Sequence, residues 1–235
     1  MHQGEKLLEV IVCSLEDALE AERGGADRME VVRDLDRGGF TPSLDLVRKI
    51  KSRVQVPMRV MLRESEDEDR PPRPVLEKLS STLSELEEIG IDGVVLGYLS
   101  DGQVDTETMI EILSTARKIS ATFHHAFDNS RVPVQTIRAL HKLPQVDHVL
   151  TSGGLGTLSA RGARLNQYCD TAGATLTILA GGGMTPEVLR DLTATTNVRE
   201  FHVGRAARDP NSGNVSASLV SQLKNTLRRS GLAEL

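Results

Sequence analysis

The sequence is poor in cysteine and in aromatic residues, and each shortage excludes a class of protein. Only Cys13 and Cys169 occur among 235 residues, so the chain has neither a disulfide framework nor the local Cys/His spacing of a structural zinc site. Tryptophan is absent and aromatic residues make up 3%, which argues against stacking platforms for nucleic-acid bases. No apolar run approaches the roughly 18 residues of a transmembrane helix, so no membrane span is expected.

Charge and the N-terminal sequence narrow the possible partners further. The formal net charge is -5, and lysine and arginine are scattered rather than clustered, so no basic face for nucleic acid is predicted. The first residues, MHQGEKLLEV, lack the pattern of a secretory signal peptide. Together with the scarcity of cysteine, this favours a cytoplasmic protein whose partner is a small molecule or a metal ion.

Eight short aliphatic segments predict strands. They show little polar alternation, which is typical of parallel strands buried on both faces, and they are Leu7–Cys13, Arg28–Val32, Met58–Leu62, Gly93–Leu96, Ala121–His124, Val146–Leu150, Thr175–Ala180 and Glu200–Val203. Amphipathic stretches such as Val75–Ile89 lie between them and predict helices. The alternation predicts an α/β fold, a (β/α)₈ TIM barrel formed as a single domain over residues 1–235, with a doubly wound sheet as the alternative.

Polar residues interrupt these aliphatic strands, and a barrel aims them at one axis. They are Glu9, Glu30, Arg63, His124 and His202. Carboxylates, imidazoles and a guanidinium in one lumen suit acid–base chemistry or metal binding. The alternative is structural, because Glu9 or Glu30 can form an ion pair with Arg28, Arg59 or Arg63. The remaining histidines, His2, His125, His141 and His148, are predicted to lie on the surface.

Glycine-rich turns follow the last three predicted strands. Glycine lets the backbone approach an anion, and the N–H groups of a following helix act as donors. The predicted anion-binding residues are Ser152, Gly153, Gly154, Gly181, Gly182, Gly183, Gly204 and Arg205. The alternative is that these glycines only permit tight strand-to-helix turns.

The acidic segment Glu64–Asp69 follows the third strand and leads into a proline- and arginine-rich stretch. This composition predicts a solvated loop rather than a dedicated binding element.

Several motifs in fixed order resemble the CutC family, and the likeness runs from Leu8 to about Ala207. They include SLEDALEAERGGADRMEV, GGFTPS, DGVVLGYLSDGQVD, TFHHAFD, VLTSGG, AGGG and EFHVGRAAR. The resemblance implies a TIM barrel, copper binding, a cytosolic location and a homodimer or higher homo-oligomer. It also makes Glu9, Glu30, Arg63, His124, Asp128 and His202 candidate catalytic residues, because these positions match the family pattern.

Two positions depart from the family in a way that concerns copper. The proposed copper ligands of the family are cysteines near the ends of strands one and two, and the matching positions here are Ile11 and Val32. Cys13 lies two residues beyond Ile11 on the same strand face and is the remaining sulfur candidate. The possible metal ligands are therefore Cys13, Glu9, Glu30, His124 and His202.

Two functions follow from these residues. The family resemblance implies a CutC-like protein that acts in copper homeostasis. The alternative is a TIM-barrel enzyme acting on a small anionic or phosphorylated metabolite, in which Glu9 or Glu30 and His124 exchange protons while Arg63 and the last turns hold the anion. A hard divalent cation bound by the carboxylates and histidines is a variant of this alternative.

Overall fold

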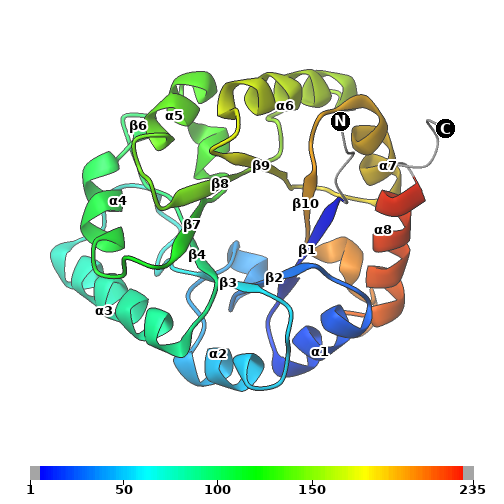
Figure 1. The fold of residues 1–235 in the computed structure, drawn as a ribbon, viewed down its shortest axis with the longest axis horizontal. Helices are drawn as coiled ribbons and strands as arrows, with labels where there is room; N and C mark the ends of the chain where they lie inside the picture. Colours follow the sequence, from blue (N-terminus) through cyan, green and yellow to red (C-terminus); the bar gives the residue numbers. More distant parts are fainter. Residues whose placement is uncertain (1–5, 230–235) are drawn as a thin grey trace.

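The computed structural model describes residues 6–229, and in this range eight parallel strands close into a barrel surrounded by helices (Figure 1). The order around the barrel is β1-β10-β9-β8-β7-β4-β3-β2, which confirms the TIM barrel and excludes the doubly wound sheet. The barrel strands are β1 (Leu7–Val12), β2 (Arg28–Val31), β3 (Met58–Met61), β4 (Gly93–Leu96), β7 (Ser120–Phe123), β8 (Val146–Thr151), β9 (Thr177–Ala180) and β10 (Glu200–Val203).

The helices follow the strands in alternation. They are α1 (Leu15–Arg23), α2 (Leu44–Lys51), α3 (Arg73–Ile89), α4 (Thr106–Leu113), α5 (Pro133–Leu140), α6 (Leu158–Ala172), α7 (Pro186–Thr195) and α8 (Ala217–Arg229), with the 3₁₀ helices η1 (Leu35–Arg37), η2 (His125–Asn129) and η3 (Arg205–Ala207). A two-stranded hairpin, β5 (Leu99–Ser100) with β6 (Gln103–Val104), stands outside the barrel and was not predicted. Within residues 6–229 no helix combines the length and the apolar character needed to cross a membrane.

Local sequence signals set where the helices begin. The side chain of Ser14 accepts the N–H of Asp17 at the start of α1, and Thr185 accepts the N–H of Val188 at the start of α7. Pro186 occupies the first turn of α7, where its missing N–H costs no hydrogen bond. These caps fix how each helix leaves the strand end before it, which is also where a TIM barrel places its site.

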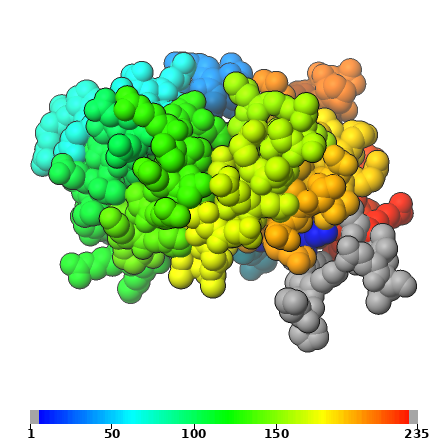
Figure 2. Space-filling view, turned by 90° about the horizontal axis from the view of Figure 1, so that it is seen from above, coloured from blue at the N-terminus to red at the C-terminus, as the bar shows by residue number. Residues whose placement is uncertain are grey.

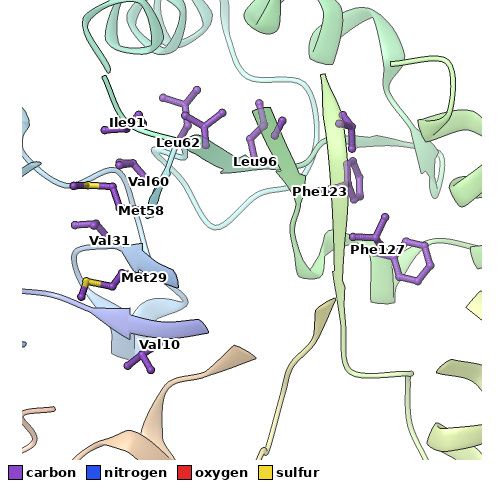
Figure 3. Packing of buried hydrophobic residues seen from close by; sticks show 14 of the residues in the cluster. Val10, Met29, Val31, Met58, Val60, Leu62, Ile91, Leu96, Phe123 and Phe127 are labelled. Carbon is purple, nitrogen blue, oxygen red and sulfur yellow. The ribbon is translucent and has the colours of Figure 1, made fainter. Parts of the chain in front are cut away.

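The hydrophobic core lies between the strands and the helices. Alternate strand residues such as Val10, Met29, Val60 and Phe123 point outward and are fully buried there (Figure 3). Seen from the side, the helices from α3 to α7 form a continuous outer layer (Figure 2). Because the aliphatic residues point outward, the other strand face turns into the barrel and carries the polar residues.

Candidate functional site

A cavity of about 640 Å³ opens at the C-terminal ends of the barrel strands. Its floor contains Glu30 from β2 and His202 from β10, and its rim contains Arg63, His125 and Arg205 from the loops that follow β3, β7 and β10. This volume falls within the range of small-molecule sites, and the position is the usual one for a TIM-barrel active site.

Two buried carboxylates, Glu30 on the floor of the cavity and Glu9 beneath it, differ in environment. Glu9 accepts hydrogen bonds from Arg28 and from His202 Nδ1, the latter at 2.7 Å. Burial alone would raise its pKa, but Arg28 and His202 hold the pKa of Glu9 well below its usual range. Glu9 is therefore an ionised anchor beneath the cavity rather than part of its lining.

Glu30 differs from Glu9 in both its partners and its pKa. One of its oxygens lies 3.5 Å from His202 Nε2, and the other, Oε1, is buried with no hydrogen-bond partner among the described residues. Burial raises the pKa of Glu30 to about 7, although His202 opposes the rise. Burial also lowers the pKa of His202, but Glu30 and Glu9 outweigh it and raise that pKa above its usual value. The cavity thus ends on a carboxyl that exchanges its proton near neutral pH.

A ring of charges fills the barrel below this floor. Arg28 donates to Glu200 at 2.7 Å, and His148 Nε2 lies 3.0 Å from the same carboxylate. His148 Nδ1 contacts Asp147 at 2.7 Å, and Arg59 donates twice to that aspartate, each time at 2.7 Å. The prediction that His148 lies on the surface was wrong, because this register turns it into the barrel.

His124 is a buried neutral donor at the side of the cavity. Its Nδ1 accepts the N–H of Ala126 at 3.1 Å, which leaves the proton of the neutral ring on Nε2. Burial lowers the pKa of His124 to about 3, and the nearby Arg63 contributes to the shift. At neutral pH this side chain can donate a hydrogen bond but carries no charge.

His125 and Asp128 form a dyad beside the cavity. His125 Nδ1 lies 3.1 Å from Asp128, which also accepts hydrogen bonds from Thr151 and from the N–H of Ser152. Burial would raise the pKa of Asp128, but these bonds lower it to about 2. The Asp128 carboxylate therefore accepts the hydrogen bond from His125 Nδ1, and His125 Nε2 is left as the basic atom of the ring. A Cβ at Gly181 would lie 3.3 Å from that Nε2, so the ring faces the turn after β9. The surface prediction for His125 is therefore only partly right, since its side chain is 43% exposed and lines the cavity.

The turn after β9 presents backbone donors. Gly182, Gly183 and Met184 line the cavity, and their N–H groups meet no acceptor among residues 6–229. Arg161 donates to the carbonyl of Gly182 at 2.9 Å and thereby fixes the peptide. Gly182 and Gly183 have φ of +75° and +67°, the left-handed region that favours glycine. These donors suit an anion.

The structure does not place the turn after β8 in the cavity. The N–H groups of Ser152, Gly153 and Gly154 are taken by Asp128, Thr151 Oγ1 and Ser152 Oγ, at 2.9, 3.0 and 3.0 Å. The N–H of Gly181 is likewise taken, by the carbonyl of Thr151. These four residues therefore close the local turn structure, which was the alternative interpretation, and only Gly182, Gly183, Gly204 and Arg205 of the predicted anion-binding set line the cavity.

Two arginines on the rim have no carboxylate within 4 Å among the described residues. Arg63 donates to the carbonyls of Ser65 and Glu66, at 2.6 and 2.7 Å, and Arg205 is exposed. The acidic segment Glu64–Asp69 is mostly exposed, as expected, but Glu64 pairs with Lys78 at 2.8 Å. Its carboxylates therefore leave the rim arginines available for an anionic ligand.

An apolar wall lies across three neighbouring strands. We use this name for Ile11, Val32, Leu35 and Met61, which line the cavity from β1, β2 and β3 and the start of η1. Ile11, Val32 and Met61 belong to a small hydrophobic cluster separate from the main core, together with Val95. The cavity thus has one apolar side and one polar side.

The donors do not fit a cysteine-based metal site. Cys13 is not part of the cavity lining, and its sulfur accepts a hydrogen bond from Arg208 at 3.4 Å, so a cation faces the place where a metal would bind. Burial also raises the pKa of Cys13, which disfavours the thiolate. No group of three or more His, Cys, Asp or Glu side chains in residues 6–229 is arranged to hold a metal ion, so Glu9, Glu30, His124 and His202 do not form the predicted cation site.

A sequence profile of the CutC family matches residues 6–207. The chain belongs to the CutC family. A human relative, named copper homeostasis protein cutC homolog, is 33% identical over 86% of this chain and 75% of its own length. A family protein CutC from Xanthomonas campestris (strain B100) is 33% identical over 89% of this chain and 87% of its own.

Solved structures agree on the fold. The CutC structure from Streptococcus agalactiae superposes with a TM-score of 0.79 at 23% identity, covering 85% of this chain and 98% of that one. Phosphoribosyl anthranilate isomerase from Thermotoga maritima gives a TM-score of 0.65 at 13% identity, covering 95% and 99%. At these identities the likeness concerns the barrel alone.

For this CutC chain, the structure gathers Glu30, Arg63, His124 and His202 at the cavity and leaves Glu9 and Asp128 behind them as partners of His202 and His125. His125 and the apolar wall were not predicted as parts of the site. His125 had a signal, since Asp128 follows it by three residues directly after a strand. His2 lies outside the described residues.

Proposed function

We propose that this CutC chain is an enzyme that moves a proton on a small anionic, phosphate-bearing molecule bound in the cavity. The observation that carries the proposal is Glu30, a 2%-exposed carboxyl with an unpartnered oxygen on the floor of the 640 Å³ cavity. Leaving such an atom unpaired is costly, and a ligand that pairs with it recovers that cost.

Two groups on different sides of the cavity suit proton transfer. Glu30 has a pKa of about 7, so both of its protonation states are present near neutral pH. His125, held by Asp128, presents a basic Nε2 on the side of β7. One group can take a proton from the ligand while the other returns it, with His124 donating a hydrogen bond to the charge that develops.

The anionic end of the ligand is placed by charge and by backbone donors. Arg205 and the N–H groups of Gly182 and Gly183 converge from the adjacent strands β10 and β9. Guanidinium groups and free backbone N–H groups at strand ends are the usual phosphate partners in TIM barrels.

Copper handling is the second candidate, and the names of the relatives favour it. Met61 and Met184 line the cavity, and thioether groups suit copper(I). We infer that any copper site in this chain uses these groups rather than Cys13, because the thiol lies outside the cavity lining beside Arg208.

A thermal-shift panel distinguishes the two candidates. It compares copper(I) under anaerobic conditions, common divalent metals and phosphorylated metabolites. A ligand at about 100 times its Kd adds about 2.7 kcal/mol, which for a chain of this length raises Tm by about 5–10 °C. We expect this rise with a phosphorylated compound. A rise with copper(I) alone would replace the enzyme by the second candidate.

Paired variants test where the anion binds. Arg205→Gln is expected to weaken binding of the phosphorylated ligand about tenfold or more. Arg53→Gln alters another exposed arginine, one that forms no ion pair with a carboxylate among residues 6–229, and should leave the affinity unchanged. Conversion of the ligand is followed by proton NMR, because moving a proton within a molecule leaves its mass unchanged, and Glu30→Gln is expected to slow it by about 10²–10⁴-fold. Conversion that is unchanged in Glu30→Gln would contradict the proposal.

A further inference from the structure

The geometry points to one ligand class, a phosphate ester that carries an apolar group about the size of a single ring. Its phosphate binds at the turns after β9 and β10, and the apolar group, which we call the body of the ligand, lies on the apolar wall. This inference rests on the proposed function and adds the chemistry of the substrate. It follows from the order of the strands, from the apolar wall and from the unpaired atom of Glu30.

The strand order places the two halves of such a ligand side by side. The donors of Gly182, Gly183 and Arg205 follow β9 and β10, and the apolar wall follows β1, β2 and β3, which are the next strands around the barrel. A molecule anchored at the turns therefore extends directly over the wall.

Gly204 lets the apolar wall reach the phosphate turns. It lines the cavity after β10, and a Cβ at this position would lie 3.0 Å from Ile11 Cδ1. That approach is closer than side chains normally make, so the space that a larger residue would need is already taken by Ile11. The apolar wall therefore begins directly beside the turn that carries Arg205.

The apolar wall faces the cavity although charged groups occupy the barrel directly below it. Val32 is 1% exposed and Met61 4%, and Leu35, partly exposed on η1, extends the same surface toward the rim. A sugar-like body would leave its hydroxyl groups unpaired against these side chains, whereas an apolar ring would gain by burial.

Glu30 defines one further feature of the body. Glu30 lines the cavity beside Val32, two residues along the chain, and its Oε1 is buried with no hydrogen-bond partner among residues 6–229. A protonated carboxyl donates, so the body carries an acceptor such as a carbonyl or ring nitrogen on the side that faces the floor.

Three commercially available phosphates test the inference by isothermal titration calorimetry at pH 6.5. Phenyl phosphate has an apolar body, ribose 5-phosphate a polar one, and inorganic phosphate none. We expect phenyl phosphate to bind at least about tenfold more tightly than either of the others. Equal or tighter binding of ribose 5-phosphate would overturn the inference.

Matched variants assign the preference to the apolar wall. Val32→Thr and Val95→Thr alter two equally buried members of one cluster, but only Val32 lines the cavity. Val32→Thr should weaken phenyl phosphate several-fold and leave ribose 5-phosphate unchanged, while Val95→Thr should change neither. Leu35→Ser, at a partly exposed position, is a second variant with the same expected effect and little risk to folding. Phenyl phosphate affinity that is unchanged in both Val32→Thr and Leu35→Ser would overturn the inference.

Failure of the inference and failure of the proposed function give different results. If all three phosphates bind equally and Arg205→Gln weakens each of them, the anion site stands and the assigned body is wrong. If none of the phosphates binds the wild-type chain, the anion site itself is absent and both proposals fall.

Discussion

Replacing Arg28 by Gln is expected to lower the free energy of unfolding by about 3–5 kcal/mol. Arg28 is buried in the barrel and pairs with Glu9 and Glu200 while contacting His148. Both carboxylates hold the pKa of Arg28 above its usual value against the effect of burial. Removing the cation leaves the buried carboxylate of Glu9 without its main charge partner and takes one of its two partners from the partly buried Glu200, which costs more than the lost hydrogen bonds alone. Urea unfolding at pH 7 measures the change.

Two further variants test whether unpaired buried charge causes the loss of stability in Arg28→Gln. Arg48→Gln removes an exposed arginine that lies 3.8 Å from Asp45 and from Glu85, so its unfolding midpoint should stay close to that of the wild type. Combining Arg28→Met with Glu9→Gln and Glu200→Gln should recover most of the lost stability, because no buried charge is then left unpaired. If Arg28→Gln and Arg48→Gln unfold at the same urea concentration, the buried ring of charges does not stabilise the barrel as described.

The stability difference between Glu30→Gln and the wild type is expected to grow by about 3 kcal/mol as the pH rises from 4.5 to 7.5. Burial raises the pKa of Glu30 from 4.5 to about 7, so the folded chain holds this proton more tightly than the unfolded chain. That contribution to stability is complete below pH 4.5 and is lost as the pH rises through 7. Glutamine does not titrate and avoids the loss.

The comparison uses a difference because another group titrates with the opposite sign. The lowered pKa of His124 makes its contribution fall as the pH drops below 6.5, but it does so in both proteins and cancels. Burial lowers the pKa of His202 and Glu30 is the largest of the causes that raise it, so the difference between the two proteins reports the Glu30–His202 pair. Glu88→Gln, at an exposed helical position, is the control for the loss of one acidic side chain. A Glu30→Gln difference that does not change with pH would show that burial does not raise the pKa of Glu30 in the folded chain.

The fold and the polar lining could be predicted because both depend on local pattern. Eight aliphatic segments with helices between them indicate the barrel, and period-two alternation turns Glu9, Glu30 and His202 to the interior once the aliphatic residues face the helices. The strand ends were less certain: the first strand ends at Val12 instead of Cys13, and the seventh barrel strand begins at Thr177 instead of Thr175.

The roles of these residues depend on contacts far apart in the sequence, which a pattern does not contain. Glu9 and Glu30 look equivalent in the sequence, yet only Glu9 pairs with Arg28, whereas one oxygen of Glu30 is buried without a partner among residues 6–229. The sequence around Ser152 predicts an anion-binding turn, but in the fold the N–H of Ser152 donates to Asp128, which belongs to a different loop. His148 is turned inward by a register shift between β7 and β8 that nothing in its own segment indicates.

The ring of charges beneath Glu30 also limits how Glu30 exchanges its proton with solvent. Arg28, Glu200 and Arg59 fill the barrel below the floor, where Arg28 pairs with Glu200 and Arg59 with Asp147, and the cavity lies on the other side of Glu30. A ligand seated over Glu30 separates it from the solvent in the cavity for as long as it stays bound. A hydrogen that Glu30 removes from the ligand would therefore remain on Glu30 while the group on the opposite side supplies a different proton, and an isotopic label from that position would reach the solvent only after the product leaves.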